Sequence, residues 1–334
     1  MRTTGFIEDE SRVRHGGRSH VSMRLRCVRC GTAGLEEASA AFRCGPCGAT
    51  FAIADGIPRF VDTEAHAESF GFQWKTFATV QLDSAHGSSI SRSTFVEKTG
   101  WRLEDLRGRQ VLDAGCGMGR FAEVAADAGA EVHGVDLSLA IDAARQNLGH
   151  RPSIHLYQAD LMNLPFVDDT FDFIYSIGVL HHTPNPRRAF LGLTRLLRPG
   201  GVIAIWVYSR KLRLSIGSEL LRMVTPRLPK PWLLKACRIA IPLYWLHRVP
   251  LAGHLSRALL LTSLEPDPTW RWLDTFDWYS PRYQSKHSYA EVEGWFQEAG
   301  IAEVHRGPFP ITVAGRKPAT VSGAVRPLTQ GVTA

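Results

Sequence analysis

The chain has 334 residues, of which 44% are hydrophobic, and it carries a formal net charge of +7. This length allows one large domain, or a core domain with a small module beside it. Every apolar run is shorter than 18 uncharged residues, so we expect no membrane-spanning helix.

The N-terminal sequence lacks the apolar stretch and the cleavage pattern of a secretory signal. We therefore expect a cytoplasmic location, in which the six cysteines stay reduced. Residues 1–23 are expected to form a disordered lead-in, and residues 319–334 a disordered tail.

Two CxxC pairs predict a zinc ribbon in residues 24–61. The pairs are Cys27 with Cys30 and Cys44 with Cys47, and each places two thiolates on one tight turn. Four thiolates complete a tetrahedral sulfur site and leave no open position, so the zinc is expected to be structural. Disulfide pairing is the alternative, and a reducing compartment disfavours it.

Residues 62–104 are predicted to form an amphipathic, helical connector in which aromatic residues, Trp74 among them, gather. After the connector, strands and helices alternate as in a parallel sheet. Strands are expected near residues 110–113, 131–135, 153–157, 171–176 and 201–207. Helices are expected near residues 118–128, 138–147 and 186–197. An amphipathic helix at 288–299 and a closing antiparallel pair of strands follow.

The turn after the first of these strands indicates a ligand site. It contains the glycines Gly115, Gly117 and Gly119. Without a Cβ atom, glycine lets the backbone approach a ligand closely. A dinucleotide fingerprint would need a glycine at Arg120, and Asp113 just before the turn would repel a pyrophosphate. Asp136 ends the second strand and is suited to hold a ribose diol, so a nucleoside with a cationic tail, S-adenosylmethionine, fits better than NAD.

Further motifs follow in order. Residues 157–182 read YQADLMNLPFVDDTFDFIYSIGVLHH, and residues 188–208 read RAFLGLTRLLRPGGVIAIWVY. With the glycine turn, this order resembles the class I S-adenosylmethionine-dependent methyltransferases of the ubiquinone type. The resemblance covers roughly residues 105–208, with a weaker similarity in 287–318. A Rossmann-like domain for another ligand is the alternative, which the order of the motifs disfavours.

The resemblance implies an α/β fold, a Rossmann-like, doubly wound sheet of seven strands whose last strand is antiparallel. The methyltransferase core would comprise residues 105–208 and 287–318, and residues 209–286 would be a helical insertion over the strand ends. The segment FAIADGIPRFV after the cysteines resembles the ends of short zinc-ribbon proteins that accompany or activate methyltransferases.

Eight residues are predicted to bind the cofactor: Asp113, Gly115, Gly117, Gly119, Asp136, Leu137, Asp160 and Leu161. Asp136 would accept the ribose hydroxyls, while Asp113 and the first two glycines would line the methionine portion. Gly119 would allow close helix packing. Asp160 resembles the acid that accepts the adenine amine, with Leu161 packed on the ring, and a turn or cap residue is the alternative for Asp160.

His181 and His182 are the candidate catalytic residues, because they end the fourth strand where the methyl group would lie. A histidine could take a proton from a phenol, an enol or a hydroxyl, and His182 is preferred. Alternatively, the pair only braces the loop through hydrogen bonds.

The aromatic and polar segment 275–288, expected to be a loop, supplies Tyr279, Tyr283 and His287 as candidate substrate residues. In similar methyltransferases an N-terminal helical segment covers the cofactor, so Trp74 is a further candidate. For both segments the alternative is ordinary packing against the core.

The insertion carries most of the positive charge. From Arg210 to Leu260 it has ten Lys and Arg residues against Glu219 alone, a net charge of +9. Cations interleaved with Leu, Ile and Trp favour a membrane surface or a lipid-like substrate. An RNA backbone and a solvated helical lid are the alternatives.

The sequence therefore predicts S-adenosylmethionine-dependent methyl transfer to a small, lipophilic metabolite, on oxygen or carbon. An RNA base methyltransferase that uses the zinc ribbon and the basic insertion is the second hypothesis. A non-catalytic, methyltransferase-like scaffold that binds a partner protein is the third, and the intact acids and glycines of the turn weigh against it.

Overall fold

The computed structural model describes residues 23–63, 66–210 and 216–319. Apart from residues 23 and 319, the expected lead-in and tail lie outside the described residues. Among the described residues, no helix combines the length and the apolar character that crossing a membrane requires.

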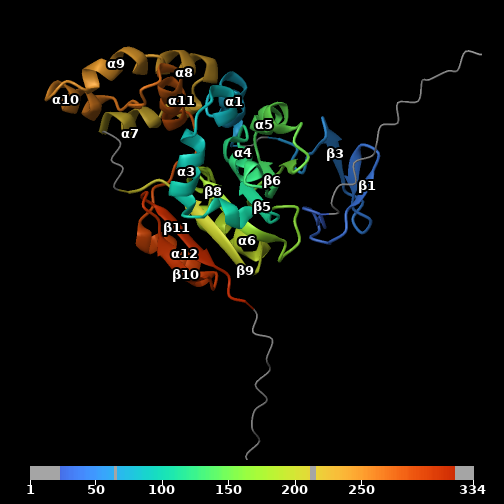
Figure 1. Cartoon of the computed structure of the whole chain (residues 1–334). Coiled ribbons are helices and arrows are strands. Elements are labelled where there is room, and N and C mark those ends of the chain that lie inside the picture. The colour runs from blue at the N-terminus through green and yellow to red at the C-terminus, as the bar shows by residue number, and fades with distance from the viewer. Residues whose placement is uncertain (1–22, 64–65, 211–215, 320–334) are drawn as a thin grey trace, which may run out of the picture.

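A seven-stranded sheet forms the core, as the resemblance implied (Figure 1). Its strands are β5 (Gln110–Ala114), β6 (Glu131–Asp136), β7 (Ile154–Gln158), β8 (Phe171–Ile177), β9 (Leu197–Trp206), β10 (Ala302–Arg306) and β11 (Thr312–Arg316). Their order across the sheet is β10-β11-β9-β8-β5-β6-β7. Neighbouring strands among β5 to β9 pair in parallel, and β11, the last strand, runs antiparallel to both of its neighbours.

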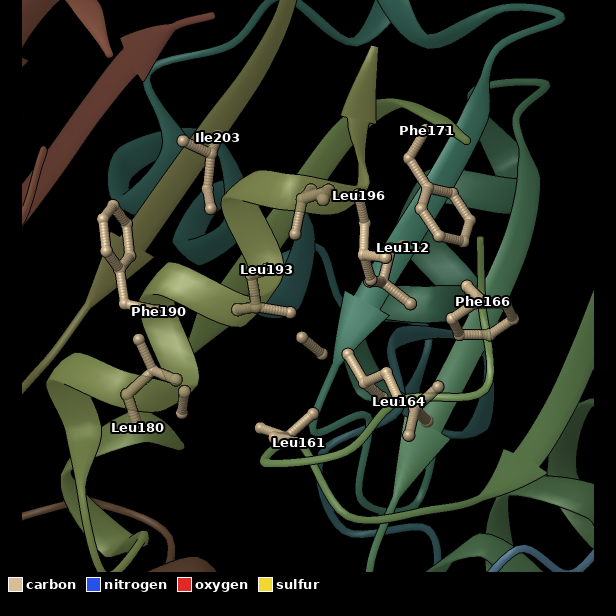
Figure 2. Packing of buried hydrophobic residues seen from close by; sticks show 14 of the residues in the cluster. Leu112, Leu161, Leu164, Phe166, Phe171, Leu180, Phe190, Leu193, Leu196 and Ile203 are labelled. Atoms are coloured by element: carbon tan, nitrogen blue, oxygen red, sulfur yellow. The ribbon is translucent and has the colours of Figure 1, made fainter. Parts of the chain in front are cut away.

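The parallel strands are near-continuous apolar runs because helices cover both faces of the sheet. Successive side chains of a strand point to opposite faces, so Leu112 of β5 joins one cluster and Val111 the other. The Leu112 cluster packs against α6 (Pro186–Leu196) and α12 (Tyr289–Glu298), and Figure 2 shows Phe190, Leu193 and Leu196 of α6 in it. The Val111 cluster packs against α3 (Ile90–Thr99), α4 (Arg120–Asp127) and α5 (Ala140–Leu148).

Strand β9 begins at Leu197, four residues before the expected start at 201. Leu197 already pairs with Phe171, and the register shifts before Val202 pairs with Phe173. Pro199 and Gly200 therefore lie at an irregularity inside the strand.

The ribbon segment forms a separate four-stranded antiparallel sheet at one side of the core (Figure 1). Its strands are β1 (Glu36–Ala38), β2 (Ala41–Arg43), β3 (Thr50–Ala54) and β4 (Ile57–Pro58). Bridges from Leu25 to Phe166 and from Arg59 to Gln158 attach it to the β7 edge of the large sheet. The rings of Phe51 and Phe60 pack together 5.1 Å apart at this junction.

Helices build the connector and the insertion. The connector contains α1 (Glu68–Thr76), α2 (Asp83–His86), α3 and a short 3-10 turn, η1 (Leu103–Leu106). The insertion contains α7 (Ile216–Arg222), the 3-10 turn η3 (Thr225–Arg227), α8 (Lys230–Cys237), α9 (Ala240–His247), α10 (Ala252–Leu259) and α11 (Pro268–Tyr279). Figure 1 shows α7 to α11 together at one end of the molecule, beside α1.

The expectation of a loop for residues 275–288 is wrong for residues 275–279, which continue α11. The helix starts earlier because Asp267 caps it, accepting a hydrogen bond from the Trp270 amide at 2.7 Å, and Pro268 occupies its first turn.

Candidate active site

A cavity of about 830 Å³ opens at the carboxyl ends of the parallel strands. This is the edge at which open α/β sheets bind ligands, because the loops after the strands meet there. Helices α1, α3 and α11 form the remaining walls. The loop after β8 contributes η2 (Leu180–His182) to the same edge.

The glycine turn lies at the floor of this cavity. Gly115 has a φ of +96°, and a Cβ atom built there would lie 2.4 Å from Cγ1 of Val179. A Cβ atom on Gly117 would lie 3.1 Å from Nε1 of Trp74. Both glycines line the cavity, whereas Gly119 packs under α5, where an added Cβ would meet Leu148 at 2.4 Å. The turn thus forms a cradle that any side chain would fill.

Asp136 is held rigidly at the end of β6. One carboxylate oxygen accepts a hydrogen bond from the Gly117 amide at 2.9 Å, and the other accepts from the amide and the hydroxyl of Ser138 at 2.8 and 2.7 Å. Burial raises the pKa of Asp136, although these hydrogen bonds act in the opposite direction. Asp136 lines the cavity, and the oxygen that accepts from Gly117 keeps a lone pair for a ligand.

Asp113 lies beneath the turn and is not among the residues that line the cavity. It is 3% exposed, and its Oδ2 atom has no hydrogen-bond partner among the described residues. Burial raises the pKa of Asp113 to about 8, and the carboxylate of Asp136 adds to this effect. The predicted contact of Asp113 with the methionine portion stays a prediction.

Leu137, Asp160 and Leu161 line the neighbouring part of the cavity. Asp160 also accepts a hydrogen bond from the Met162 amide at 2.9 Å, so it orders its own turn as well as facing the cavity. The Leu137 carbonyl accepts a hydrogen bond from Gln158 at 3.0 Å. Arg59 of the ribbon donates to the same glutamine at 3.1 Å, so the ribbon supports this end of the cavity.

The two histidines differ in position. His182 lines the cavity, and its Nδ1 atom lies 2.8 Å from the carbonyl of Tyr283. A carbonyl only accepts hydrogen bonds, so Nδ1 carries a proton and Nε2 is left as the acceptor of the neutral ring. Burial lowers the pKa of His182, so the ring is neutral at pH 7.

His181 is fully buried outside the cavity lining, with its ring stacked 3.8 Å from that of Tyr208. Burial also lowers the pKa of His181, and neither ring nitrogen has a hydrogen-bond partner among the described residues.

The four ribbon cysteines form a compact group whose sulfur atoms all lie within 4.8 Å of one another. The Sγ atoms of Cys27 and Cys47 are 3.6 Å apart, and those of Cys30 and Cys44 are 3.5 Å apart. A tetrahedral site with Zn–S bonds of about 2.3 Å requires sulfur separations of about 3.8 Å, so this donor set fits zinc.

Comparison with known proteins finds similarity in the region that contains the glycine cradle, Asp136 and Asp160. Residues 112–205 match a family model described as a methyltransferase domain. Residues 112–205 therefore form a methyltransferase domain.

Curated relatives match the same region. The chain is 40% identical over 111 residues to methyltransferase GfsG of Streptomyces halstedii, a match that covers 31% of this chain and 39% of the relative. It is 34% identical over 137 residues to a ubiquinone biosynthesis O-methyltransferase of Alkalilimnicola ehrlichii, covering 39% of this chain and 56% of the relative. The matched regions thus span about two fifths to just over half of these relatives' own length.

Among solved structures, one similar to the chain is the complex between the Haloferax volcanii Trm112 methyltransferase activator and a proposed methyltransferase. The identity is 16% and the TM-score is 0.44, over 75% of this chain and 98% of that chain.

The predicted substrate residues are only in part at the cavity. Trp74 lines it, whereas Tyr279, Tyr283 and His287 are not among the lining residues. The Tyr279 hydroxyl bonds to Ser218 and to the Leu261 carbonyl, at 2.5 and 2.7 Å.

The other two candidates are engaged around the cavity rather than in it. The Tyr283 carbonyl holds His182, while the two nitrogens of His287 bond to Ser285 at 2.8 Å and to Glu291 at 2.9 Å. These contacts match the alternative, packing of the insertion against the core. A substrate contact for these residues stays a prediction.

The structure brings to the cavity several residues that sequence reasoning missed. From α11 these are Trp270, Leu273 and Asp274, and Asp277 and Trp278 of the predicted segment 275–288 line the cavity beside them. Their spacing of three and four residues marks one face of a helix, a signal that the expectation of a loop concealed. Two residues apart, Asp277 and Tyr279 face different ways.

Tyr208 and Lys98 are two further unpredicted residues of the cavity. Tyr208 follows β9 and donates a hydrogen bond to Asp277 at 3.2 Å. Lys98 of α3 lies 3.3 Å from the centroid of the Trp206 ring, and burial lowers its pKa to about 7. Tyr208 could have been found from its place after the fifth strand, whereas no local pattern marks Lys98.

Proposed function

We propose that this protein transfers the methyl group of S-adenosylmethionine to a small, lipophilic metabolite, on an oxygen or a carbon atom. One observation carries the proposal: a single cavity runs from the glycine cradle, Asp136 and Asp160 to a wall of aromatic side chains. That wall consists of Phe70, Trp206, Tyr208, Trp270, Trp278 and Phe309.

The residues at the cradle end suit the cofactor. S-adenosylmethionine supplies the methyl group from a cationic sulfonium. Asp136 would hold the ribose hydroxyls, Asp160 the adenine amine, and Leu137 and Leu161 the faces of the adenine ring. Gly115 and Gly117 leave room for the methionine portion because they lack side chains.

The residues at the aromatic end suit an apolar acceptor. Methyl transfer is an in-line displacement, so these walls would align the acceptor and exclude water. His182 offers an unprotonated Nε2 atom at the cavity and would take the proton of a hydroxyl or an enol. The Tyr208–Asp277 pair would orient polar groups of the acceptor.

The proposal also includes a structural metal ion and the cellular location of the protein. Four thiolates with tetrahedral spacing support a structural zinc, which would hold the small ribbon together. A zinc site of four thiolates requires reduced cysteines, so we propose the cytoplasm, a reducing compartment.

Calorimetry with S-adenosylmethionine tests the cofactor assignment on the full chain. Asp136→Ala should weaken binding about ten- to a hundredfold, because one hydrogen bond to a charged group contributes about 1.5–3 kcal/mol. Asp105→Ala, which removes an exposed carboxylate outside the cavity, is the matched control and should bind like the original chain. Equal affinity of the Asp136→Ala protein would refute the assignment.

Transfer of a labelled methyl group to a panel of phenols, enols and structured RNAs then tests the acceptor class. Labelling of a lipophilic phenol or enol supports the proposal. Labelling of RNA alone would replace it with the nucleobase activity, and cofactor binding without transfer to any acceptor would favour the scaffold.

A further inference from the structure

Exposed apolar side chains gather on the helical insertion. Among the described residues, every large hydrophobic side chain that is strongly exposed lies between Leu220 and Leu264, apart from Ile90 and Val96. Isolated exposed leucines are common on soluble proteins, whereas a concentration of them marks a site of contact with another apolar surface.

The outward faces of the helices carry these residues. In α8 Leu233 and Leu234 face the core, while Trp232 is 76% exposed. In α9 Tyr244 is buried and Trp245 is 72% exposed. Along α10 and the residue before it, three exposed leucines recur at intervals of four residues: Leu251, Leu255 and Leu259. A surface helix of a soluble domain has polar residues on its outer face, so the exposed apolar residues of α8, α9 and α10 depart from this pattern.

Exposed cations lie in the same segment as the apolar residues. The described residues of the insertion expose Arg227, Lys235, Arg238 and Arg248. The single acid of residues 210–260, Glu219, is paired with Lys286. The outer surface of α7–α10 is therefore apolar and positively charged at once.

We propose that the outer surface of α7–α10 docks on an anionic lipid surface. Tryptophan and leucine side chains would enter the boundary between headgroups and acyl chains, while lysine and arginine extend toward the phosphates. Each cation near such a surface contributes about 1 kcal/mol, so the charge of this segment is complementary to the lipid.

The docking surface is connected to the cavity. Helix α11 packs against α8 and α9, with Trp272 Nε1 donating to the Leu234 carbonyl at 2.7 Å and Arg271 donating to the Ile241 carbonyl at 3.3 Å. The same helix presents Trp270 and Asp277 to the cavity. Figure 1 shows these helices side by side at the end of the molecule that carries α1. This proposal rests on the proposed function, since a lipophilic acceptor would reach the cavity from the lipid.

Other occupants fit the surface less well. A nucleic-acid backbone would pair with the cations and leave the exposed leucines in water. A second copy of the chain, placed by a two-fold axis, would bring the same cations face to face. Anionic lipid is the partner that satisfies both the charge and the apolar side chains.

Co-sedimentation of the full chain with phosphatidylcholine vesicles, with and without phosphatidylglycerol, tests the proposal. We expect binding to the anionic vesicles that weakens with salt. Lys235→Gln with Arg238→Gln should lower this binding about thirtyfold, since two contributions of about 1 kcal/mol are lost. Trp232→Ser with Trp245→Ser should lower binding to both kinds of vesicle about tenfold or more.

Val96→Ser is the matched control, because it removes an exposed apolar residue from α3, outside the insertion, and should change nothing. Calorimetry with S-adenosylmethionine on each variant, without vesicles, checks the cofactor site separately. Intact cofactor binding without vesicle binding would overturn the docking proposal alone.

Three further results would also overturn docking. The first is equal loss of vesicle binding in the Val96→Ser protein. The second is a dimer that Leu251→Ser disperses while vesicles are not bound. The third is saturable RNA binding that the tryptophan variants weaken.

Discussion

Replacing Lys98 by methionine is expected to stabilise the protein, because the cavity wall holds the ammonium group away from water. Burial is the main cause that lowers the pKa of Lys98 from 10.5 to about 7, and the positive charge of Arg120 adds to it. Glu97 and Asp274 oppose the shift without cancelling it. A methionine side chain of similar length has no charge to desolvate.

The magnitude follows from the pKa values. The difference between 10.5 and about 7, at about 1.4 kcal/mol per unit, sets an upper limit of about 5 kcal/mol. The Trp206 ring, 3.3 Å from the ammonium, returns about 1–2 kcal/mol to the charged form. Lys98 is also only half-buried, so water in the cavity hydrates it in part. We therefore expect a gain of about 2 kcal/mol in the free energy of unfolding at about pH 6.

The gain should depend on pH in a defined direction. Between about pH 7 and 10.5 the unfolded chain binds the lysine proton and the folded chain does not, so the stability of the original protein rises with pH. The advantage of the Lys98→Met protein should shrink across this window and vanish above it. Urea unfolding at several pH values measures both quantities.

Lys75→Met, at an exposed position of α1, is the control and should change stability by less than about 0.5 kcal/mol. A Lys98→Met protein that is no more stable at pH 6, or whose gain does not fall with rising pH, would refute the reasoning.

Three other changes test the site. Metal analysis should find about one zinc per chain, and Cys27→Ser should lose the metal and open the ribbon to proteolysis; a zinc-free protein with an intact ribbon would contradict this. Gly115→Ala should destabilise the protein by about 2–3 kcal/mol in urea unfolding, since the φ of +96° at Gly115 and the nearby Val179 side chain both oppose a Cβ atom. Adding Val179→Ala to this variant should restore only part of the lost stability, because it removes the contact and leaves the backbone strain. His182→Asn should lower kcat/KM about a hundredfold and leave cofactor affinity unchanged. Because burial lowers the pKa of His182, the activity of the original protein should fall only below about pH 6.5, where the ring becomes protonated. The activity of the His182→Asn protein should not show this fall at low pH.

The cradle end of the site could be predicted because its residues follow strand ends in the chain. Gly115, Gly117, Asp136 and Asp160 each come directly after a buried apolar run, and the carboxyl ends of parallel strands meet at one edge. Tertiary structure refined this prediction at Asp113, which lies in β5 beneath the turn and outside the cavity lining.

The acceptor end could not be predicted in the same way. Tyr279 and Asp277 lie two residues apart on α11, and only the packing of that helix against α1 and α8 turns Asp277 into the cavity and Tyr279 toward Ser218. Lys98 comes from a third segment, and its neighbour Trp206 is more than a hundred residues away.

The cysteine spacing predicted the metal-ligand set, while the position of the ribbon required the structure. Two CxxC turns gather their sulfur atoms locally, so the spacing alone is sufficient. The attachment of Arg59 to Gln158, and through it to Leu137, joins segments that share no local pattern.

By itself, the sequence determined the sheet, the glycine cradle, the cysteine cluster and the charge of the insertion. Each of these depends on periodicity, spacing or composition within a short stretch of chain. Tertiary structure alone decided which residues face the acceptor, and that α7–α10 present apolar side chains outward. Those properties depend on which faces of distant segments meet, because burial of one helix face fixes the direction of every other side chain on that helix.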